Sequence, residues 1–205
     1  MTKEGLFLVA VVGGVGAGKT TVCKIFEGLG LPVIYADEIA RNTCKYKEIK
    51  EKLLGLFGEK IVSDGAIDRI KLGKLVFENK EERERMEAVV LPVIDAIIVG
   101  EVERWRREGV QIGILDIPLL EKSSLQKKVD EILFVEARDE DRLRRVVSSR
   151  GWSENDLLQR EQAQTPLAQK RAIATRRIIN TTSISPEELN EQCQDVLLEW
   201  RKLLN

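Results

Sequence analysis

Eight residues near the start of the chain, Gly13–Thr20 (GGVGAGKT), restrict the possible folds more than any other part of the sequence. They satisfy the pattern G-x-x-x-x-G-K-[ST], in which glycines let successive backbone N–H groups turn toward phosphate oxygens. The continuous apolar run Leu6–Val12 precedes them and the amphipathic segment Thr21–Phe26 follows. The loop therefore joins a predicted buried strand to a predicted helix, and this context predicts a nucleoside-triphosphate site rather than an ordinary glycine turn.

The residues of this loop have distinct expected roles. Lys19 is expected to bring positive charge to the β- and γ-phosphates of ATP, and the Thr20 hydroxyl is expected to coordinate Mg²⁺. The other predicted nucleotide contacts are Gly14, Val15, Gly16, Ala17, Gly18 and Thr21. Asp116 follows a predicted strand and is a candidate outer-sphere carboxylate for Mg²⁺, although an acid in this place is often a cap or a solvated loop residue.

Short apolar runs alternate with longer helical patterns along the chain. After Leu6–Val12, the predicted strands are Val33–Tyr35, Gln111–Leu115, Ile132–Val135 and, with the weakest pattern, Arg177–Ile179. The helical patterns are Thr20–Leu29, Glu38–Leu54, Lys71–Phe77, Glu81–Arg107, Glu140–Ser148, Pro166–Ala174 and Pro186–Leu204. This alternation predicts an α/β fold with a parallel sheet covered by helices on both faces. Residues 45–108 show no strand pattern and are predicted to form a helical insertion over the C-terminal edge of the sheet, where such folds bind ligands.

Composition excludes several functional classes. The 205 residues include no histidine, which removes Ser-His-Asp and Cys-His triads and nearly all catalytic zinc sites. With 33 basic and 34 acidic residues the net charge is −1, so no general nucleic-acid or membrane-surface binding is expected. Cys23, Cys44 and Cys193 are too few for a disulfide framework. We find no export signal or membrane segment, so reduced thiols in a cytoplasmic protein are expected.

A basic stretch late in the chain indicates the kind of nucleotide-binding protein. Residues 138–177 hold ten arginines and lysines against six acids. Such a stretch is typical of a lid that closes onto transferring phosphates, with Arg145 and Arg150 as candidates, although most of its arginines are expected on a solvated face. No guanine-reading N-K-x-D motif follows, because Asn79-Lys80-Glu81-Glu82 fails at its last position. A kinase of a small metabolite is therefore favoured over a GTPase or a motor.

Six further fragments, in order and in register behind the loop, resemble one family. They are Leu31–Arg41 (LPVIYADEIAR), Phe57-Gly58, Gly65–Arg69 (GAIDR) with Leu72, Ile117–Leu120 (IPLL), Gln164-Thr165-Pro166 with Lys170-Arg171, and Ile178–Asn180 (IIN). Each fragment alone is weak. Together they resemble dephospho-coenzyme A kinase over essentially the whole chain.

The resemblance implies a P-loop kinase fold with a five-stranded parallel core, helices on both faces, a helical acceptor-binding insertion and a lid. In this chain these would form one domain, with the core at 1–44, 109–149 and 175–205, the acceptor region at about 45–108 and the lid at about 150–174. The implied reaction transfers the γ-phosphate of ATP, with Mg²⁺, to the ribose 3′-hydroxyl of dephospho-CoA. Both expected partners are small molecules, and the oligomeric state is left open.

The resemblance also assigns residues outside the loop. Asp37 matches an acid that serves as general base and metal partner, and a carboxylate just beyond the second strand can accept a hydroxyl proton; the alternative is a helix N-cap. Arg41 and Arg69 match positions beside the acceptor pocket, unless they are simply solvated or ion-paired. Asn180 matches a position near the adenine, with a turn residue as the alternative. Pro118 and Leu119 are expected to contact the acceptor.

The sequence departs from the family pattern at several acceptor-side positions. Tyr35 replaces the first acid of the D-A-D motif, Leu91 replaces the histidine of a His-Pro pair, and the P-L-L-F-E block is altered at Glu121 and Lys122. These departures leave two alternatives open. One is a P-loop kinase for another small acceptor, such as a nucleoside monophosphate or a sugar acid. The other is a non-catalytic nucleotide-binding protein.

Overall fold

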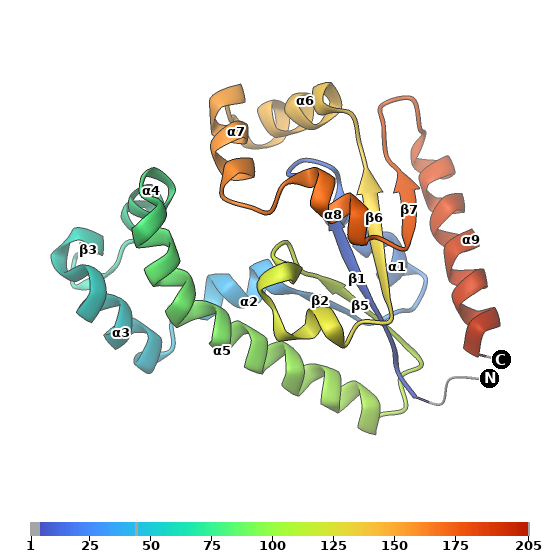
Figure 1. The fold of residues 1–205 in the computed structure, drawn as a ribbon, viewed down its shortest axis with the longest axis horizontal. Coiled ribbons are helices and arrows are strands. Elements are labelled where there is room, and N and C mark those ends of the chain that lie inside the picture. The colour runs from blue at the N-terminus through green and yellow to red at the C-terminus, as the bar shows by residue number, and fades with distance from the viewer. Residues whose placement is uncertain (1–4, 44, 205) are drawn as a thin grey trace.

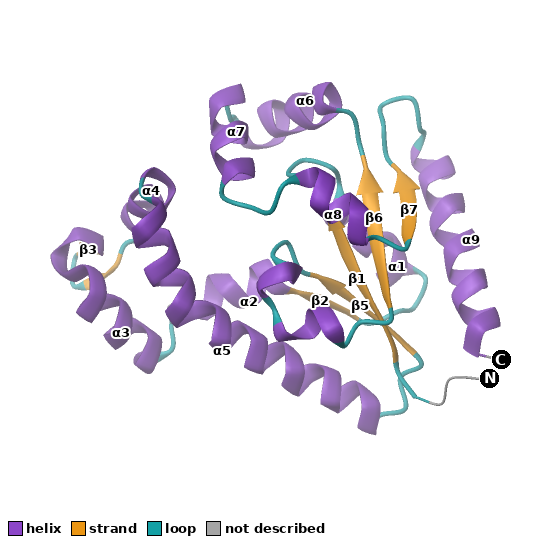
Figure 2. Ribbon diagram, in the orientation of Figure 1, coloured by secondary structure: helices purple, strands orange, loops and turns teal. Residues whose placement is uncertain are grey.

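A computed structural model of the chain describes residues 5–43 and 45–204, and its centre is a five-stranded parallel sheet (Figures 1 and 2). In spatial order the strands are β2 (Val33–Tyr35), β5 (Ile112–Asp116), β1 (Phe7–Gly13), β6 (Glu131–Glu136) and β7 (Arg176–Ile179). All four pairings in this sheet are parallel. The five strands predicted from the sequence are confirmed, with ends that differ by at most one residue.

Helices cover both faces of the sheet because β1 is apolar on both sides. Successive side chains of a strand point to opposite faces. Phe7 and Val9 pack on the face covered by α1 (Lys19–Gly28) and α9 (Pro186–Leu204), where the Trp200 ring lies 5.1 Å from that of Phe26. Leu8, Ala10 and Val12 pack on the opposite face, which is covered by α5 (Lys80–Arg107) and α8 (Leu167–Ile173). The two-sided covering predicted for the sheet is confirmed.

The helical insertion differs from the prediction in two places. The single pattern Glu38–Leu54 corresponds to two helices, α2 (Ala36–Thr43) and α3 (Lys47–Phe57), and Cys44 between them lies outside the described residues. The expectation of no strand between residues 45 and 108 is wrong. After the 3₁₀ turn Gly58–Ile61, β3 (Val62–Ser63) and β4 (Ala66–Ile67) form an antiparallel hairpin before α4 (Arg69–Glu78).

Sequence periodicity does not reveal the hairpin, because each of its strands has only two residues. Its turn did carry a signal. Asp64 and Gly65 have φ values of 51° and 73°, and an Asp-Gly pair is favoured where both central residues of a tight hairpin turn need positive φ.

The segment between β6 and β7 forms α6 (Asp139–Arg150), α7 (Glu154–Gln162) and α8, and α7 was not predicted. Leu157 is the buried residue of α7, so the helix has almost no apolar period. A capping box begins it instead: Ser153 Oγ accepts from the Asp156 N–H at 3.2 Å, and Asp156 Oδ2 accepts from the Ser153 N–H at 2.9 Å. Two 3₁₀ turns, Leu120–Lys122 and Ser124–Lys127, follow β5. Across the described ranges, no helix is long and apolar enough to cross a membrane.

Because the strands are parallel, the predicted site residues lie at one edge of the sheet. Parallel strands end at the same edge, and loops beyond their C-terminal ends form the ligand crevice in folds of this kind. β1 ends at Gly13 in the glycine loop, β5 ends at Asp116, and β2 runs into α2, which carries Asp37. The insertion and the α6–α8 segment extend from this same edge (Figure 1).

Candidate active site

The shape of the glycine loop is held by residues far along the chain. Gly16 and Gly18 have φ values of 76° and 90°, which L side chains rarely adopt. A Cβ at Gly18 would lie 2.2 Å from Asn180 Nδ2, and one at Gly16 would lie 2.7 Å from the Arg142 carbonyl oxygen. Both positions therefore need glycine, because Asn180 just after β7 and the backbone of α6 lie directly against the loop.

Asn180 and Arg145 fasten the loop at this contact. Asn180 Nδ2 donates to the Ala17 carbonyl at 2.8 Å. Arg145 Nη2 donates to the Asn180 carbonyl at 2.8 Å, and its Nη1 donates to the Ala17 carbonyl at 3.2 Å. Asn180 was predicted to lie near the adenine and Arg145 to contact phosphates. The structure brings both to the loop, where they act as braces of its backbone.

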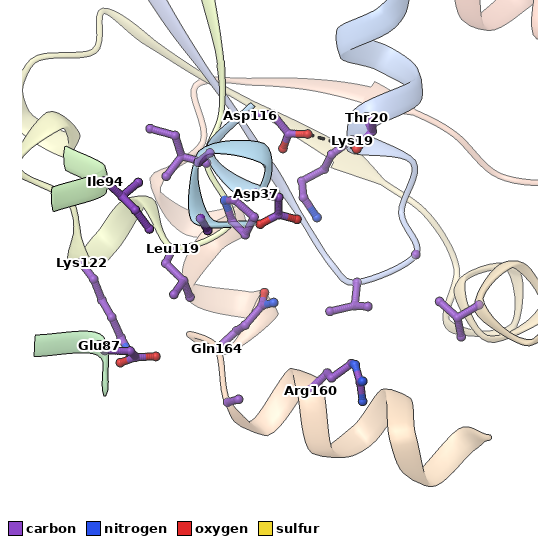
Figure 3. Close-up of a pocket in the computed structure, with 18 of the residues that line it drawn as sticks. Lys19, Thr20, Asp37, Glu87, Ile94, Asp116, Leu119, Lys122, Arg160 and Gln164 are labelled. Carbon is purple, nitrogen blue, oxygen red and sulfur yellow. Dashed lines mark hydrogen bonds and ion pairs between the residues drawn. The ribbon is translucent and has the colours of Figure 1, made fainter. Parts of the chain in front are cut away.

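The opposite side of the loop carries the charged groups (Figure 3). Lys19 Nζ donates to the carbonyls of Gly13 and Gly14 at 3.2 and 3.0 Å. Burial lowers the pKa of Lys19, and the carboxylates of Asp116 and Asp37 oppose that shift. Figure 3 shows Lys19 beside both carboxylates.

Asp116 forms the floor of the site at the end of β5. One of its oxygens, Oδ2, accepts from the Thr20 hydroxyl at 3.1 Å. The other, Oδ1, is buried and has no hydrogen-bond partner in the part of the chain that the structure describes. Burial raises the pKa of Asp116, with Lys19 acting against that rise. A buried polar atom without a partner is costly, so this oxygen fits a site that a bound cation completes.

The residues present fit Mg²⁺ in particular. A carboxylate oxygen and a hydroxyl are oxygen ligands of the kind that Mg²⁺ prefers, and Thr20 is exposed enough to reach a ligand. No group of three or more acidic, cysteine or histidine side chains that could hold a metal occurs among the described residues. Mg²⁺ usually takes one or two protein carboxylates and completes its shell with phosphates and water.

Asp37 lies across the cavity from the loop, on the first turn of α2. Its side chain is exposed and lines the same cavity as Lys19 and Thr20 (Figure 3). Within the described ranges its carboxylate makes no hydrogen bond to the backbone of α2, so the alternative of a helix cap has no support in the structure. The carboxylate is free to accept a proton from a ligand.

These groups open into one cavity of about 650 Å³, which extends from the loop along α5. The loop side is polar. The far side is mainly apolar, with Val76, Phe77, Met86, Leu91, Ile94, Ile98, Ile117 and Leu119, but it also includes the charged residues Arg83, Glu87, Asp95 and Lys122. Pro118, Leu119, Thr21 and Arg150 line the cavity, and their contacts with acceptor and nucleotide stay predictions. Arg41 and Arg69 do not line it and are exposed, so their acceptor contacts stay predictions.

Three residues from two distant segments form a stack that the sequence did not indicate. The Arg160 guanidinium lies 3.8 Å from the centre of the Trp152 ring and 4.5 Å from that of Phe77. All three line the cavity. Phe77 belongs to α4 and Arg160 to α7, so the stack joins the insertion to the α6–α8 segment. Only the excess of arginines between residues 138 and 177 signalled a role for Arg160.

The departures from the family pattern fall in different places. The Tyr35 hydroxyl donates to Glu27 at 3.4 Å, and Tyr35 does not line the cavity. Leu91 contributes to the apolar side of the cavity. Lys122 forms an ion pair with Glu87 of α5 at 2.6 Å in the cavity wall. The departures therefore leave the loop, Asp37 and Asp116 unchanged.

Comparisons with known proteins agree with this geometry. A sequence model described as CoaE, dephospho-CoA kinase, matches residues 7–186. The dephospho-CoA kinase of Geobacillus kaustophilus is 38% identical over 95% of this chain and 97% of its own. The crystal structure of TT1252 from Thermus thermophilus has a TM-score of 0.80 at 33% identity, covering 96% of this chain and 98% of that one. Dephospho-CoA kinase from Campylobacter jejuni has a TM-score of 0.63 at 25% identity, covering 95% and 97%.

Proposed function

The chain belongs to the dephospho-CoA kinase family, and from this premise we propose that its cavity binds ATP and dephospho-CoA together. The γ-phosphate of ATP passes to the ribose 3′-hydroxyl of dephospho-CoA. One observation carries the proposal: Lys19 and Thr20 of the glycine loop face Asp37 across a single cavity. Phosphoryl transfer needs a phosphate cradle and a proton acceptor on opposite sides of the reacting atoms, and this cavity supports that arrangement.

The donor side is built from the loop. Its backbone N–H groups and the start of α1 favour the negative charge of the phosphates. Lys19 exchanges its two carbonyl partners for phosphate oxygens, whose charge opposes the lowering of its pKa by burial. Thr20 and Asp116 would hold Mg²⁺, with Asp37 as the further candidate ligand from the sequence. When bound, Mg²⁺ supplies positive charge that stabilises the transferring phosphoryl group.

The acceptor side is built from α2 and α5. Asp37 accepts the proton of the 3′-hydroxyl as that oxygen attacks the γ-phosphorus atom. The apolar side of the cavity suits the uncharged arm of a coenzyme A precursor. We assign residues 45–108 to acceptor binding and residues 150–174 to a lid. Arg150 and Arg160 line the cavity from that lid and offer positive charge to the phosphates.

A coupled assay of ADP release over a panel of acceptors tests the proposal. Dephospho-CoA, a nucleoside monophosphate and a sugar acid are compared in the presence of Mg²⁺ and ATP. We expect turnover with dephospho-CoA alone and its loss in Lys19→Ala. Turnover with another acceptor, or binding of ATP without any turnover, would support one of the two alternative functions instead.

A further inference from the structure

Lys170 is a buried lysine directly behind the wall of the cavity. Its exposed fraction is only 3%, and it does not itself line the cavity. Its Nζ donates to the Pro118 carbonyl and to Gln164 Oε1, both at 2.8 Å. Pro118 and Gln164 both line the cavity, one from the loop after β5 and the other from the loop before α8. Lys170 therefore connects two walls of the site from behind.

The chemistry of lysine fixes the orientation of the Gln164 amide. An ammonium group has three donors and no acceptor, so only the amide oxygen of Gln164 can face it. The amide nitrogen then points away from Lys170, and within the described chain it bonds to no protein group. Figure 3 shows Gln164 projecting into the space that Lys19 and Asp37 also border. Gln164 is thus presented to the reaction space as a hydrogen-bond donor.

A second contact joins the same two loops. The Thr165 hydroxyl donates to Glu121, which follows Pro118 by three residues. Three charged groups act on Lys170 from different elements: Glu121 after β5, Lys19 on α1 and Glu161 on α7. Burial lowers the pKa of Lys170 to about 8; Lys19 adds to this effect, whereas Glu121 and Glu161 oppose it. A buried ammonium group is costly, so its retention beside the cavity calls for a role.

We propose that Lys170 is a positioning residue that holds the Gln164 amide as a donor toward the oxygens of the phosphoryl group in transit. This inference rests on the proposed function and adds Gln164 to the groups that touch the reacting atoms. Lys170 acts through Gln164 and does not touch substrate itself; its bond to the Pro118 carbonyl holds the ammonium group in place. Preorganised donors of this kind act mainly in the transition state, so the expected effect is on kcat.

A double-mutant cycle tests the coupling between the two side chains. Lys170→Met and Gln164→Leu should each lower kcat by about tenfold to 100-fold and change KM for ATP by less than about twofold. The double variant should be no slower than Gln164→Leu, because Lys170 has nothing left to orient. Gln169→Leu, an exposed position on the same helix, is the control and should keep wild-type kcat.

The pH dependence of kcat distinguishes a positioning role of Lys170 from a packing role, because packing alone would not change with pH near 8. Above about pH 8 Lys170 becomes neutral and its hydrogen bonds lose their charge assistance. The ratio of kcat between wild type and Gln164→Leu should therefore fall as pH rises through 8. Lys19 is present in both enzymes, so its own titration cancels in the ratio. If Lys170→Met fails to fold, the pH dependence of the kcat ratio between wild type and Gln164→Leu still tests the role of Lys170.

The outcomes separate this inference from the proposed function. Independent, multiplicative losses in the cycle, or a ratio that does not change with pH, would overturn the role of Lys170 while leaving the kinase activity established. A wild-type enzyme that does not phosphorylate dephospho-CoA would contradict the proposed function and the role of Lys170 together.

Discussion

The proposed roles place Asp37 on the acceptor and Lys19 on the donor, and Asp37→Asn tests this division. The asparagine keeps the size of the side chain and loses its basicity. We expect kcat to fall by about 100-fold or more, with ATP affinity and melting temperature unchanged, because the carboxylate acts on the acceptor proton. Steady-state kinetics, ATP titration and thermal melting measure the three quantities.

Glu38→Gln is the matched control for Asp37→Asn, because Glu38 is the next residue of α2 and is also exposed. It should keep wild-type kcat. An Asp37→Asn enzyme with normal kcat and a lowered melting temperature would show that Asp37 stabilises α2 and has no part in catalysis.

The burial of Asp116 leads to a prediction about the thermal stability of the protein. Its folded-state pKa is raised above the ordinary 3.8 by burial, so its charged form costs stability as pH rises above that value. Asp116→Asn keeps an acceptor for Thr20 and removes the charge. Without metal and nucleotide at pH 7, we expect the variant to melt about 2–4 °C higher than wild type, which corresponds to about 1 kcal/mol.

The same variant should lose the stabilisation that Mg²⁺ adds to bound ATP, because Oδ1 no longer offers a charged ligand. The difference in melting temperature between variant and wild type should widen from pH 4 toward pH 7. Thermal melts over this range, with and without Mg²⁺ and ATP, measure both effects. A destabilised variant at pH 7 would contradict the penalty assigned to the buried charge.

At the scale of elements, Arg160 of α7 and Phe77 of α4 make the only aromatic–cation contact that the described residues show between these two helices. Phe77→Ala removes one side of that stack. A partly exposed cation–π contact contributes about 0.5–1 kcal/mol or somewhat more, so we expect KM for dephospho-CoA to rise about threefold to tenfold. The change in kcat should be smaller.

Ile70→Ala on the same helix is the control, because its side chain is 83% exposed and faces away from the cavity lining. Steady-state kinetics with dephospho-CoA as the varied substrate measure both variants. Equal KM values for Phe77→Ala and wild type would show that the stack does not help to hold the acceptor.

The elements that the sequence predicted well are those with long local patterns. The apolar runs of β1 and β5 and the flanking helices are visible without tertiary information. The β3–β4 hairpin and α7 have no such local pattern, because two-residue strands have no period and α7 buries little of its surface. In the site, the loop follows from its glycines and Asp37 from the family resemblance. The Phe77–Arg160 stack joins segments that nothing in the sequence connects. Gln164 and Lys170 belong to one fragment of the resemblance, but nothing in the sequence predicts their hydrogen bond behind the cavity wall.

Over the whole molecule, the glycine loop is braced by Asn180, which follows the edge strand β7. Asn180→Ala removes the donor to the Ala17 carbonyl and an acceptor for Arg145. We expect the kcat/KM for ATP to fall about tenfold or more while KM for dephospho-CoA changes little, because a displaced loop weakens donor binding. Asn155→Ala on the exposed surface of α7 is the control. An equal rise in both KM values would indicate general loosening of the fold.

The clasp between Ala17 and Asn180 also sets an order of events during protein synthesis. The glycine loop is synthesised more than a hundred residues before α6 and the end of β7, which hold its backbone in place. A nascent chain therefore carries the complete loop sequence, without the braces that shape it, while the intervening residues are made. The loop can reach its braced shape only after β7 has been made and has joined the sheet.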